Sequence, residues 1–510
     1  MTTFNLADLY ESVVDAVGDR EALVAGGRRL TYSALDERAN RLAHHLSSLG
    51  VGEGDFVGLQ LVNGTEYAEG MLACFKIRAV PVNVNFRYVA DELRHLFDDA
   101  DIIVNITNEQ FANRVVEART DRLEHVIVVE RDYESALAVA SPERDFGPRS
   151  SDDLYCAYTG GTTGFPKGVI WRHEDIFFAG MGGGDVFHSG NYIKTPDELI
   201  ERIPDVGMVA LATPPLMHVS AHWLLFSLFF GGGKMVLTPQ GKFDPKTIWS
   251  LVGGESVNML IIVGDAMARP LADELTRESY DTSTLFVVGS GGAVLSPSTK
   301  EKLSALLPAA MIVDGFGSSE TGTMGTTSGP GGFKMGVDSV VLDDEMRPVA
   351  PGSDVIGRLG RRGHIPLRYH KDPEKTANTF ATVEGERWVL PGDFARVLYD
   401  GTIELLGRGS VSINTGGEKV YPEEVEAVVK GHPDVFDAVV VGVPDERWGE
   451  RVVAVIKAGS RDPTLEEVQA VCRDKLAGYK VPREIRLVDE IVRSPAGKTD
   501  YRWAKHIASG

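Results

Sequence analysis

The residues best suited to chemistry lie in a string of glycines, threonines and one lysine, Tyr158 to Gly168. This string follows a short apolar stretch, Leu154 to Ala157, that predicts a β-strand. Backbone N–H groups, hydroxyl groups and a single cation together suit the binding of phosphate. The string is not a Walker A loop, because Pro166 precedes Lys167 and a glycine follows it. It therefore predicts a phosphate-binding loop of a different type.

A second string, Asp314 to Gly322, follows the predicted strand Ala310 to Val313. Its small residues allow a ligand to approach the backbone closely. Phe316 offers a ring face for stacking, Ser319 a hydroxyl group, and Glu320 a hard oxygen ligand for Mg²⁺. Taken alone, the string is more typical of a turn with a capping glutamate.

Three shorter strings complete the set of candidates. The first follows a predicted strand, the second carries an aspartate that suits a ribose diol, and the third holds a lysine near the C-terminus. They are Gly289–Ala293, Pro391–Ala395 with Gly407-Arg408 downstream, and Arg493–Lys498. Each alone is typical of an ordinary turn or a solvated charge, and only their order along the chain suggests more.

The composition restricts what the chain can bind. The 510 residues include 73 acidic and 52 basic side chains, which leaves a net charge of −21. Such a charge argues against a broad basic face for nucleic acid. A polyanionic ligand must then be bound by local groups, such as backbone N–H groups, a metal ion or one or two cations. At about 150 residues per domain, the length predicts roughly three domain-sized units.

The sequence also predicts the cellular context. No apolar stretch approaches the ~20 residues that cross a bilayer, and no basic segment precedes an apolar core at the N-terminus. The three cysteines, Cys74, Cys156 and Cys472, lie far apart and lack metal-ligand spacing. We therefore expect a cytoplasmic protein with reduced core cysteines and no integral membrane segment.

The elements that must position these strings alternate between strand and helix. Helix patterns cover residues 30–50, 65–77 and 90–97, and strand patterns cover residues 56–61, 80–83 and 102–105. The same alternation recurs between residues 208 and 313, with strands expected over 234–237, 259–263 and 285–288. This alternation predicts an α/β fold with doubly wound, mostly parallel sheets.

The C-terminal part has a different pattern. A helix is expected to open at Tyr421-Pro422, followed by strands over 438–443 and 452–456 and a helix over 465–476. This pattern predicts a small α+β domain of about 100 residues that begins near Arg408. The glycines and serine of Gly407–Ser410 suit a hinge.

Together, and in this order, the five strings resemble those of the adenylate-forming (AMP-binding) superfamily, in its acyl-CoA synthetase or fatty-acid–CoA ligase branch. The resemblance covers roughly Leu23 to Lys505. It implies a large N-terminal AMP- and acyl-binding domain, residues 1–407, of doubly wound sheets plus a small β-barrel-like subdomain. A small mobile α+β domain, residues 408–510, would carry the catalytic lysine.

The resemblance also implies the reaction. A carboxylate would attack the α-phosphate of ATP·Mg²⁺ to form an acyl-adenylate and pyrophosphate, and the thiol of CoA would then displace AMP. The cofactors and co-substrates expected are therefore ATP, Mg²⁺ and CoA. Mg²⁺ and lysines would neutralise the two anionic reactants, so that positioning and electrostatics would supply most of the barrier reduction.

The family's nucleotide-binding roles map onto residues of this sequence. The residues expected to bind the β- and γ-phosphates are Thr159, Gly161, Thr162, Thr163 and Lys167. Those expected to line the adenine site are Gly291, Gly292, Ala293, Asp314, Gly315 and Phe316, and those expected to bind the ribose are Asp393 and Arg408. Phe316 stands where the family usually has tyrosine, which should leave the stacking of adenine intact.

The catalytic and thioester-forming roles map in the same way. Ser319, where the family usually has threonine, would touch the α-phosphate, and Glu320 would be the ligand of Mg²⁺. Lys498 matches the catalytic lysine that bridges the carboxylate and the α-phosphate. Gly416 and Gly417 would lie beside the pantetheine tunnel. Ser410 occupies the hinge position, where an aspartate or lysine is usual; a small residue still permits rotation.

The acyl substrate is expected to be apolar. His218 matches the position that packs beside the acyl group in acyl-CoA synthetases, and Trp223 to Phe230 predicts a buried helix that forms a pocket wall. No aspartate for an amino group lies between Asp205 and Asp244, which argues against an amino acid. The neighbouring His222 is interpreted as a core histidine with satisfied hydrogen bonds. A fatty, branched, aryl or steroid side-chain acid follows.

Three alternatives stay open at this point: an enzyme that loads a carrier protein, a luciferase-like oxygenase, and a non-catalytic nucleotide-binding protein. The sequence leaves the chain length of the acid and the oligomeric state open, and a homo-oligomer is possible.

Overall fold

The computed structural model describes residues 2–159, 166–187, 189–239, 243–293, 295–327, 332–336, 338–408, 411–415, 418–445, 448–493 and 499–510. The helices of these residues are α1 (Leu6–Val17), α2 (Tyr32–Ser48), α3 (Thr65–Lys76), α4 (Ala90–Asp99), α5 (Glu109–Glu117), α6 (Glu134–Val139), α7 (His173–Ala179), α8 (Glu198–Glu201), α9 (Val219–Phe230), α10 (Pro245–Gly254), α11 (Gly264–Leu275), α12 (Pro297–Leu306), α13 (Pro373–Thr379), α14 (Pro422–Val429), α15 (Leu465–Lys475) and α16 (Tyr501–Ser509).

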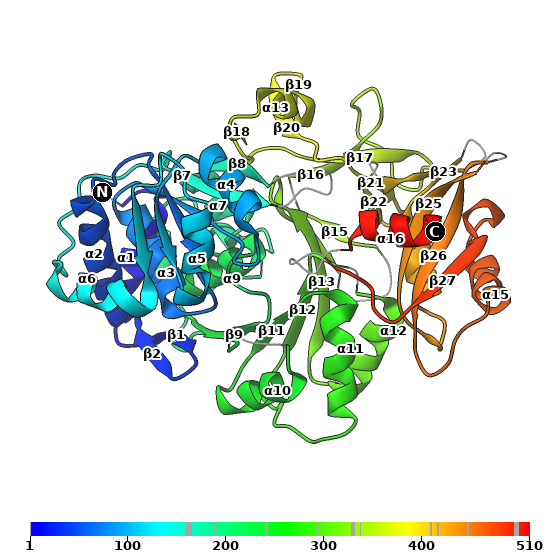
Figure 1. Ribbon diagram of the computed structural model, residues 1–510, viewed down its shortest axis with the longest axis horizontal. Helices are drawn as coiled ribbons and strands as arrows, with labels where there is room; N and C mark the ends of the chain where they lie inside the picture. Colours follow the sequence, from blue (N-terminus) through cyan, green and yellow to red (C-terminus); the bar gives the residue numbers. More distant parts are fainter. Residues whose placement is uncertain are drawn as a thin grey trace.

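The largest sheet runs through the middle of the molecule (Figure 1). Its order is β15-β14-β13-β12-β11-β9-β10-β1-β2, and the six strands from β13 to β1 are parallel. Antiparallel strands extend it at both edges. The bounds are β1 (Glu21–Ala25), β2 (Arg28–Thr31), β9 (Val209–Ala212), β10 (Lys234–Leu237), β11 (Met259–Ile262), β12 (Val287–Gly291), β13 (Met311–Ser318), β14 (Gly322–Thr327) and β15 (Lys334–Met335).

Two smaller sheets complete the N-terminal half. One is fully parallel, in the order β4-β3-β5-β6, and the other is antiparallel, in the order β18-β8-β7. Their strands are β3 (Phe56–Gln60), β4 (Val80–Asn83), β5 (Ile102–Thr107), β6 (His125–Val128), β7 (Leu154–Thr159), β8 (Lys167–Arg172) and β18 (Arg368–Tyr369). Mixed sheets and helices along the chain confirm the predicted α/β class.

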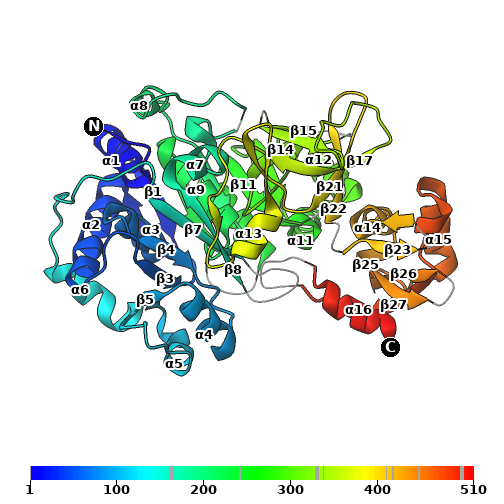
Figure 2. The ribbon, with the colours of Figure 1, turned by 90° about the horizontal axis from the view of Figure 1, so that it is seen from above.

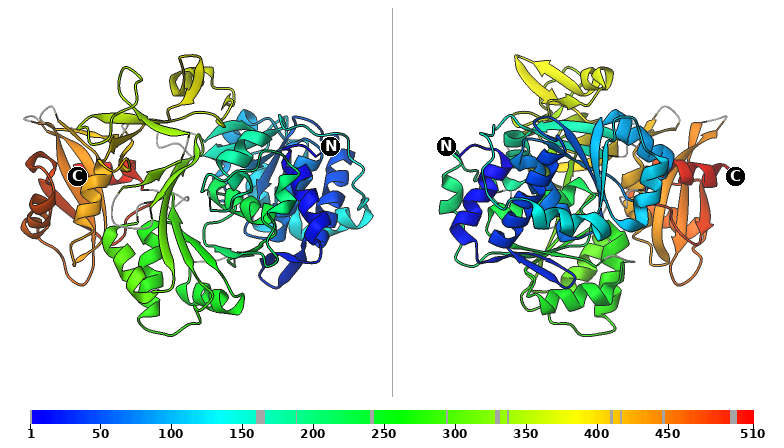
Figure 3. Two further views of the ribbon diagram at one scale, coloured as in Figure 1. Left: turned by 180° about the vertical axis from the view of Figure 1, so that it is seen from behind. Right: turned by 60° about the vertical axis from the view of Figure 1, so that its left-hand side comes forward.

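An antiparallel sheet follows in the order β19-β20-β17-β21-β22, with β16 paired to β17. The described pairings leave this sheet open, so the predicted barrel-like closure is not among them. Its strands are β16 (Ser339–Leu342), β17 (Ile356–Arg361), β19 (Phe380–Val383), β20 (Glu386–Val389), β21 (Asp393–Val397) and β22 (Ile403–Arg408). The segment with α13, β19 and β20 projects from the rest of the molecule (Figure 3).

The C-terminal sheet stands at the end of the molecule opposite the N-terminus (Figures 1 and 2). Its strands alternate side chains between two apolar cores: Val440 packs toward α14 and α15, whereas Val439 packs toward α16. The strands are β23 (Ile413–Thr415), β24 (Glu418–Val420), β25 (Val435–Asp445), β26 (Gly449–Ala458) and β27 (Glu484–Val488). This is the α+β pattern expected for the C-terminal part.

Two predicted strands are shifted in the structure. The strand expected over 285–288 begins at Val287, because the N–H of Leu285 bonds the carbonyl of Thr282 in a turn. The strand expected to end at Val313 continues to Ser318, because β14 turns back and pairs with it. Asp314, Gly315 and Phe316 therefore belong to a strand, and the expectation that they follow one is wrong.

Helix α9 confirms the expectation of a buried apolar helix. It carries no aspartate, glutamate, lysine or arginine, and Leu225, Phe226, Leu228, Phe229 and Phe230 are almost fully buried. A helix that is apolar on every side is stable only when other elements surround it. In the described residues, no helix is long and apolar enough to cross a membrane.

Candidate active site

The carboxyl ends of the parallel strands gather several predicted residues at one edge of the largest sheet. Strands β12 and β13 are neighbours, and their register pairs Ser290 with Asp314 and Gly291 with Gly315. A Cβ atom on Gly291 would lie 3.4 Å from the carbonyl oxygen of Gly315, and Gly292 has a φ of +77°. At these glycines the edge exposes its backbone, so that a flat ligand such as a nucleotide base could approach it closely.

Phe316, the next residue after Gly315 on β13, packs against Phe333 and strand β14. Its ring centroid lies 5.0 Å from that of Phe333, in an edge-to-face arrangement. Across the sheet it faces Gly325, where an added Cβ would lie 2.6 Å from the ring. The ring is fixed by strand β14, which is consistent with a stacking surface.

Asp314 is the titratable group at this edge. Burial raises the pKa of Asp314 to about 7, and the nearby Lys300 opposes this rise. Lys300, on α12, donates a hydrogen bond to the carbonyl of Thr327 at 3.2 Å, and burial lowers the pKa of its ammonium group. The Asp314 carboxyl thus retains its proton up to about neutral pH, with the Lys300 ammonium group near it at the predicted adenine site.

Glu320 lies in the turn between β13 and β14 and is buried. The hydroxyl of Tyr369 donates a hydrogen bond to Glu320 Oε1 at 2.7 Å. The indole N–H of Trp171 donates to the carbonyl oxygen of Ser319 at 3.0 Å. Thr321 Oγ1 accepts from the N–H of Ser318 at 3.0 Å. The turn that carries Ser319 and Glu320 is thus held by β8, β18 and its own side chains.

Lys167 begins β8, and Thr159 ends β7 directly opposite it. The Lys167 ammonium group forms an ion pair with Asp372. Asp372 also caps α13 by accepting a hydrogen bond from the N–H of Lys375 at 2.9 Å. The bond from Lys167 holds the pKa of Asp372 below its usual value.

Strand pairing connects the phosphate-loop lysine to the predicted magnesium ligand. Strand β18 pairs with β8, with Tyr369 opposite Val169. Residues 369–372 therefore contact Glu320 through Tyr369 and Lys167 through Asp372. The fold brings together two side chains that lie far apart in the sequence.

The two histidines of the predicted acyl region have different environments. His218 is half-buried at the N-cap position of α9. His222, one turn later, is fully buried, and its two ring nitrogens lie 3.1 Å from the hydroxyl of Tyr155 and 3.2 Å from that of Tyr67. Burial lowers the pKa of His222 to about 3, so the ring is neutral. Its interpretation as a core histidine is confirmed.

Comparison with known proteins identifies the family. A profile of AMP-binding enzymes matches residues 10–366, and a profile of the AMP-binding enzyme C-terminal domain matches residues 424–498. The chain belongs to the AMP-binding enzyme family.

Two curated relatives are similar over almost their whole length. The chain is 49% identical to a medium/long-chain-fatty-acid–CoA/3-oxocholest-4-en-26-oate–CoA ligase of Mycolicibacterium smegmatis, covering 99% of this chain and 96% of the relative. It is 48% identical to a 3-oxocholest-4-en-26-oate–CoA ligase of Rhodococcus rhodochrous, covering 98% and 95%. The predictions of the family and of the enzyme class, an acid–thiol ligase, are thereby confirmed.

A solved structure supports the fold. The anthranilate CoA ligase AuaEII in complex with anthranoyl-AMP has a TM-score of 0.87 at 23% identity, covering 100% of this chain and 98% of that one. At this identity the likeness shows the arrangement of an AMP-binding enzyme and not its substrate.

Several residues expected from the family lie outside the described residues. These are Gly161, Thr162, Thr163, Ser410, Gly416, Gly417 and Lys498. Asp393 and Arg408 are described as register partners on β21 and β22, which places their backbones side by side. Ala293 lies just beyond β12 and is half-buried. Their roles in the AMP-binding enzyme stay predictions.

The structure adds residues that the sequence motifs missed. Tyr369, Asp372, Trp171 and Asn83 contact the predicted site residues or the strands that carry them. Asn83 joins the end of β7 to the acyl region, since its amide group bonds the backbone of Tyr158 and the carbonyl of Met217 at 2.7–2.9 Å. Only Asp372 had a local signal, the Asp-Pro-Glu start of a helix.

The residues fit a magnesium ion bound mainly by nucleotide. Among the described residues, no group of three or more histidine, cysteine, aspartate or glutamate side chains is placed to bind a metal. Glu320 alone offers a buried carboxylate at the predicted position. One carboxylate plus phosphate oxygens is a common way for a protein to hold Mg²⁺.

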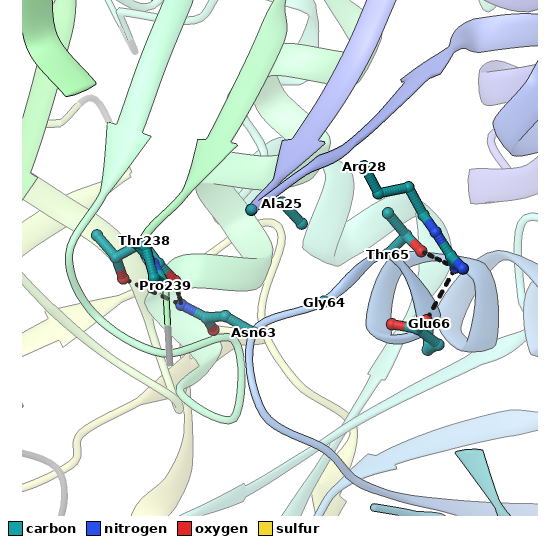
Figure 4. Close-up of a pocket in the computed structure, with 9 residues that line it drawn as sticks. Ala25, Arg28, Asn63, Gly64, Thr65, Glu66, Thr238 and Pro239 are labelled. Atoms are coloured by element: carbon teal, nitrogen blue, oxygen red, sulfur yellow. Dashed lines mark hydrogen bonds and ion pairs between the residues drawn. The ribbon is translucent and has the colours of Figure 1, made fainter. Parts of the chain in front are cut away.

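A separate surface pocket of about 250 Å³ lies where β1 and β10 end and α3 begins (Figure 4). Arg28 points toward Thr65 and Glu66 there, and its guanidinium forms ion pairs with Glu66 and Glu134. Asn63 reaches across to Thr238. None of the predicted site residues lines this pocket, and its cation is already paired.

Proposed function

We propose that the protein is an ATP-dependent acyl-CoA ligase that activates an apolar carboxylic acid through an acyl-adenylate. The acyl group is transferred to CoA, with release of AMP and pyrophosphate. The observation that carries the proposal is that Lys167 and Glu320 both contact residues 369–372, and that Glu320 lies in the turn that follows the glycine-lined edge. A cation and a buried carboxylate at this place suit ATP and its metal ion.

The proposed substrate is a fatty acid or a steroid side-chain acid. The names of the two curated relatives support this class, and so does α9, a buried apolar helix that begins after His218 and that we propose as the wall of the acyl site. The helix has no aspartate, glutamate, lysine or arginine, and its one histidine, His222, is neutral because burial lowers its pKa. Such a wall favours an apolar acyl group over a charged one.

In the proposed mechanism, Lys167 exchanges Asp372 for phosphate oxygens when ATP binds. Ser319 and Glu320 face the α-phosphate and the metal, and Lys498 bridges the carboxylate and the α-phosphate. Mg²⁺, when bound, supplies positive charge against the phosphates. Asp393 and Arg408 bind the ribose. The chemical step needs little proton transfer, so these residues act by position and charge.

The division of labour between domains is part of the proposal. Residues 1–407 bind AMP and the acyl group, and residues 408–510 form the mobile domain with Lys498. Gly416 and Gly417 then lie beside the path of pantetheine during thioester formation. We further propose a cytoplasmic location, which the three buried, unpaired cysteines support. A homo-oligomer fits the proposal but is not required by it.

Pyrophosphate release from ATP·Mg²⁺ across a panel of acids, with and without CoA, tests the proposal. We expect release with apolar acids, and AMP and acyl-CoA once CoA is added. If the acyl group were transferred to a holo-carrier protein and not to CoA, the acceptor would be a carrier protein. Light emission with a luciferin would indicate an oxygenase. No release with any acid, together with ATP binding, would leave a nucleotide-binding protein.

A further inference from the structure

Arg361, the last residue of β17, is a buried cation. Its side chain belongs to a residue that is only 4% exposed, and burial lowers its pKa. Tyr192 and the carboxylates of Asp338 and Asp175 oppose this lowering of the pKa, but no carboxylate of the described residues is in ion-pair contact with Arg361, and its Nε has no hydrogen-bond partner. A buried charge without a carboxylate partner costs stability. The groups that accept hydrogen bonds from Arg361 therefore show what the buried charge does.

Three backbone carbonyls accept hydrogen bonds from one nitrogen of this guanidinium, Nη1. Arg361 donates to the carbonyl oxygens of Thr321 at 2.6 Å, Thr323 at 2.9 Å and Ala179 at 3.4 Å. Thr321 and Thr323 belong to the turn and to strand β14, and Ala179 ends α7. Since carbonyl dipoles that point to one place repel each other, a cation at their centre stabilises their approach.

The turn at Gly322 and the end of α7 lie very close to each other. Gly322, between the two threonines, has a φ of +70°, and a Cβ there would lie 2.3 Å from the carbonyl oxygen of Ala179. The turn therefore packs directly on the end of α7. Glu320 and Ser319 lie immediately before the carbonyls that Arg361 binds.

We propose that Arg361 is a positioning residue for the adenylation half-reaction, because it fixes the turn that presents Ser319 and Glu320. Trp171 and Tyr369 hold the first half of this turn. Arg361 holds the second half, where Thr321 is fully buried. The inference rests on the proposed function, because it assigns the turn to ATP·Mg²⁺.

The test compares R361M, R361K and the matched control R362M. Arg362 is the next residue on the chain, half-exposed, and pairs with Glu386 at the surface. Methionine fills a similar volume but donates no hydrogen bond to the three carbonyls. Lysine keeps a cation among them.

We expect R361M to lower the rate of pyrophosphate release about tenfold or more, as small misplacements in active sites do. The Mg²⁺ concentration for half-maximal release should rise, and thioester formation from supplied acyl-adenylate should change less than about twofold. R361K should recover part of the loss, and R362M should match the wild type. Equal loss in both half-reactions, or unchanged values in R361M, would overturn the inference.

Calorimetric binding of ATP·Mg²⁺ separates this inference from the proposed function, because it needs no acid. Weaker binding by R361M than by R362M supports the role of Arg361 even if no acid in the panel reacts. Equal binding and equal Mg²⁺ dependence reject it even if the ligase activity is established. If R361M does not fold by circular dichroism, R361K is compared with R362M by the same measurements.

Discussion

At the scale of single residues, the candidate site consists of charged groups that each have a specific neighbour. Glu320 is bound by Tyr369, Lys167 is paired with Asp372, and Asp314 lies near Lys300. In a partly buried site such neighbours hold a side chain in one orientation before the ligand arrives. ATP then exchanges one set of partners for another and does not have to order free side chains.

Lys498→Ala tests the residue that the family resemblance makes catalytic. We expect adenylation, measured as pyrophosphate release, to fall by about a hundredfold or more, because a charge present in the transition state is lost. The reaction of supplied acyl-adenylate with CoA should be spared. Equal loss of both half-reactions would indicate a structural lysine.

Asp314→Asn tests the titration of the buried carboxyl at the predicted adenine site. Because burial raises the pKa of Asp314 from 3.8 to about 7, the folded protein retains a proton between these pH values that the unfolded chain has lost. The stability contributed by the protonated carboxyl is thus fully present below about pH 4 and is lost as the pH rises through about 7.

We therefore expect the Tm of the wild type to fall between pH 5 and pH 8 by about 2 °C or more relative to that of D314N. Scanning calorimetry at several pH values measures this difference. The exposed Asp354 provides the control D354N, which should follow the wild type. Parallel curves for the wild type and D314N would contradict a raised pKa at Asp314.

At the scale of elements, the pairing of β8 with β18 determines the site. This pairing places the start of α13 beside the phosphate-loop lysine and places Tyr369 beside the turn after β13. The backbone bonds from Leu367 to Ile170 and from His370 to Gly168, at 2.7 and 2.8 Å, extend it at both ends. Two polar contacts with the site thus depend on one short strand.

Asp372→Asn separates the two roles of the α13 cap. Asparagine caps helices as well as aspartate does, so α13 should remain, but the charge opposite Lys167 is lost. Because the pair is partly exposed and competes with phosphate, we expect the KM for ATP to fall by about twofold to fivefold. D372A should show the same KM and lose about 1 kcal/mol of unfolding free energy with the cap. A higher KM in both variants would mean that Asp372 orients Lys167 for ATP.

At the scale of the whole molecule, Arg269 connects helix α11 to the C-terminal part of the chain. Arg269, on α11, donates to the carbonyl oxygens of Val435 at 3.0 Å and Lys430 at 3.3 Å, and its guanidinium lies 5.7 Å from the ring centroid of Phe436. It also contacts Asp265 on its own helix. These contacts join α11 to the C-terminal part, whose place in the molecule Figure 2 shows.

Arg269→Ala should loosen this orientation. We expect cleavage by a protease near the proposed boundary at residue 408 to become about fivefold faster or more, because at least two hydrogen bonds from a charged group are lost. The ratio of the two half-reaction rates should change in the same variant. R277A, at an exposed arginine just after α11, is the control. Unchanged cleavage and an unchanged ratio would show that Arg269 does not hold the domain.

The sequence by itself determined the local elements and the chemical character of the site. Strand 234–237 was predicted with its observed bounds because consecutive apolar residues suit a strand buried on both faces. Helix α2 begins after Thr31 because the threonine side chain caps it. The order of glycine-rich and charged strings sufficed to predict the family, since phosphate binding by local backbone N–H groups and charges leaves a pattern in the sequence.

Only the tertiary structure decided which distant side chains serve the site. Tyr369 and Arg361 meet the Glu320 turn through strand pairing and packing between segments far apart in the chain, and no local periodicity encodes such a partner. The extension of β13 to Ser318 likewise depends on the return of β14. Local sequence patterns determine the hydrogen bonds within one helix or strand. The contacts between distant segments depend instead on how the whole chain buries its apolar surface and gives each buried polar group a hydrogen-bond partner.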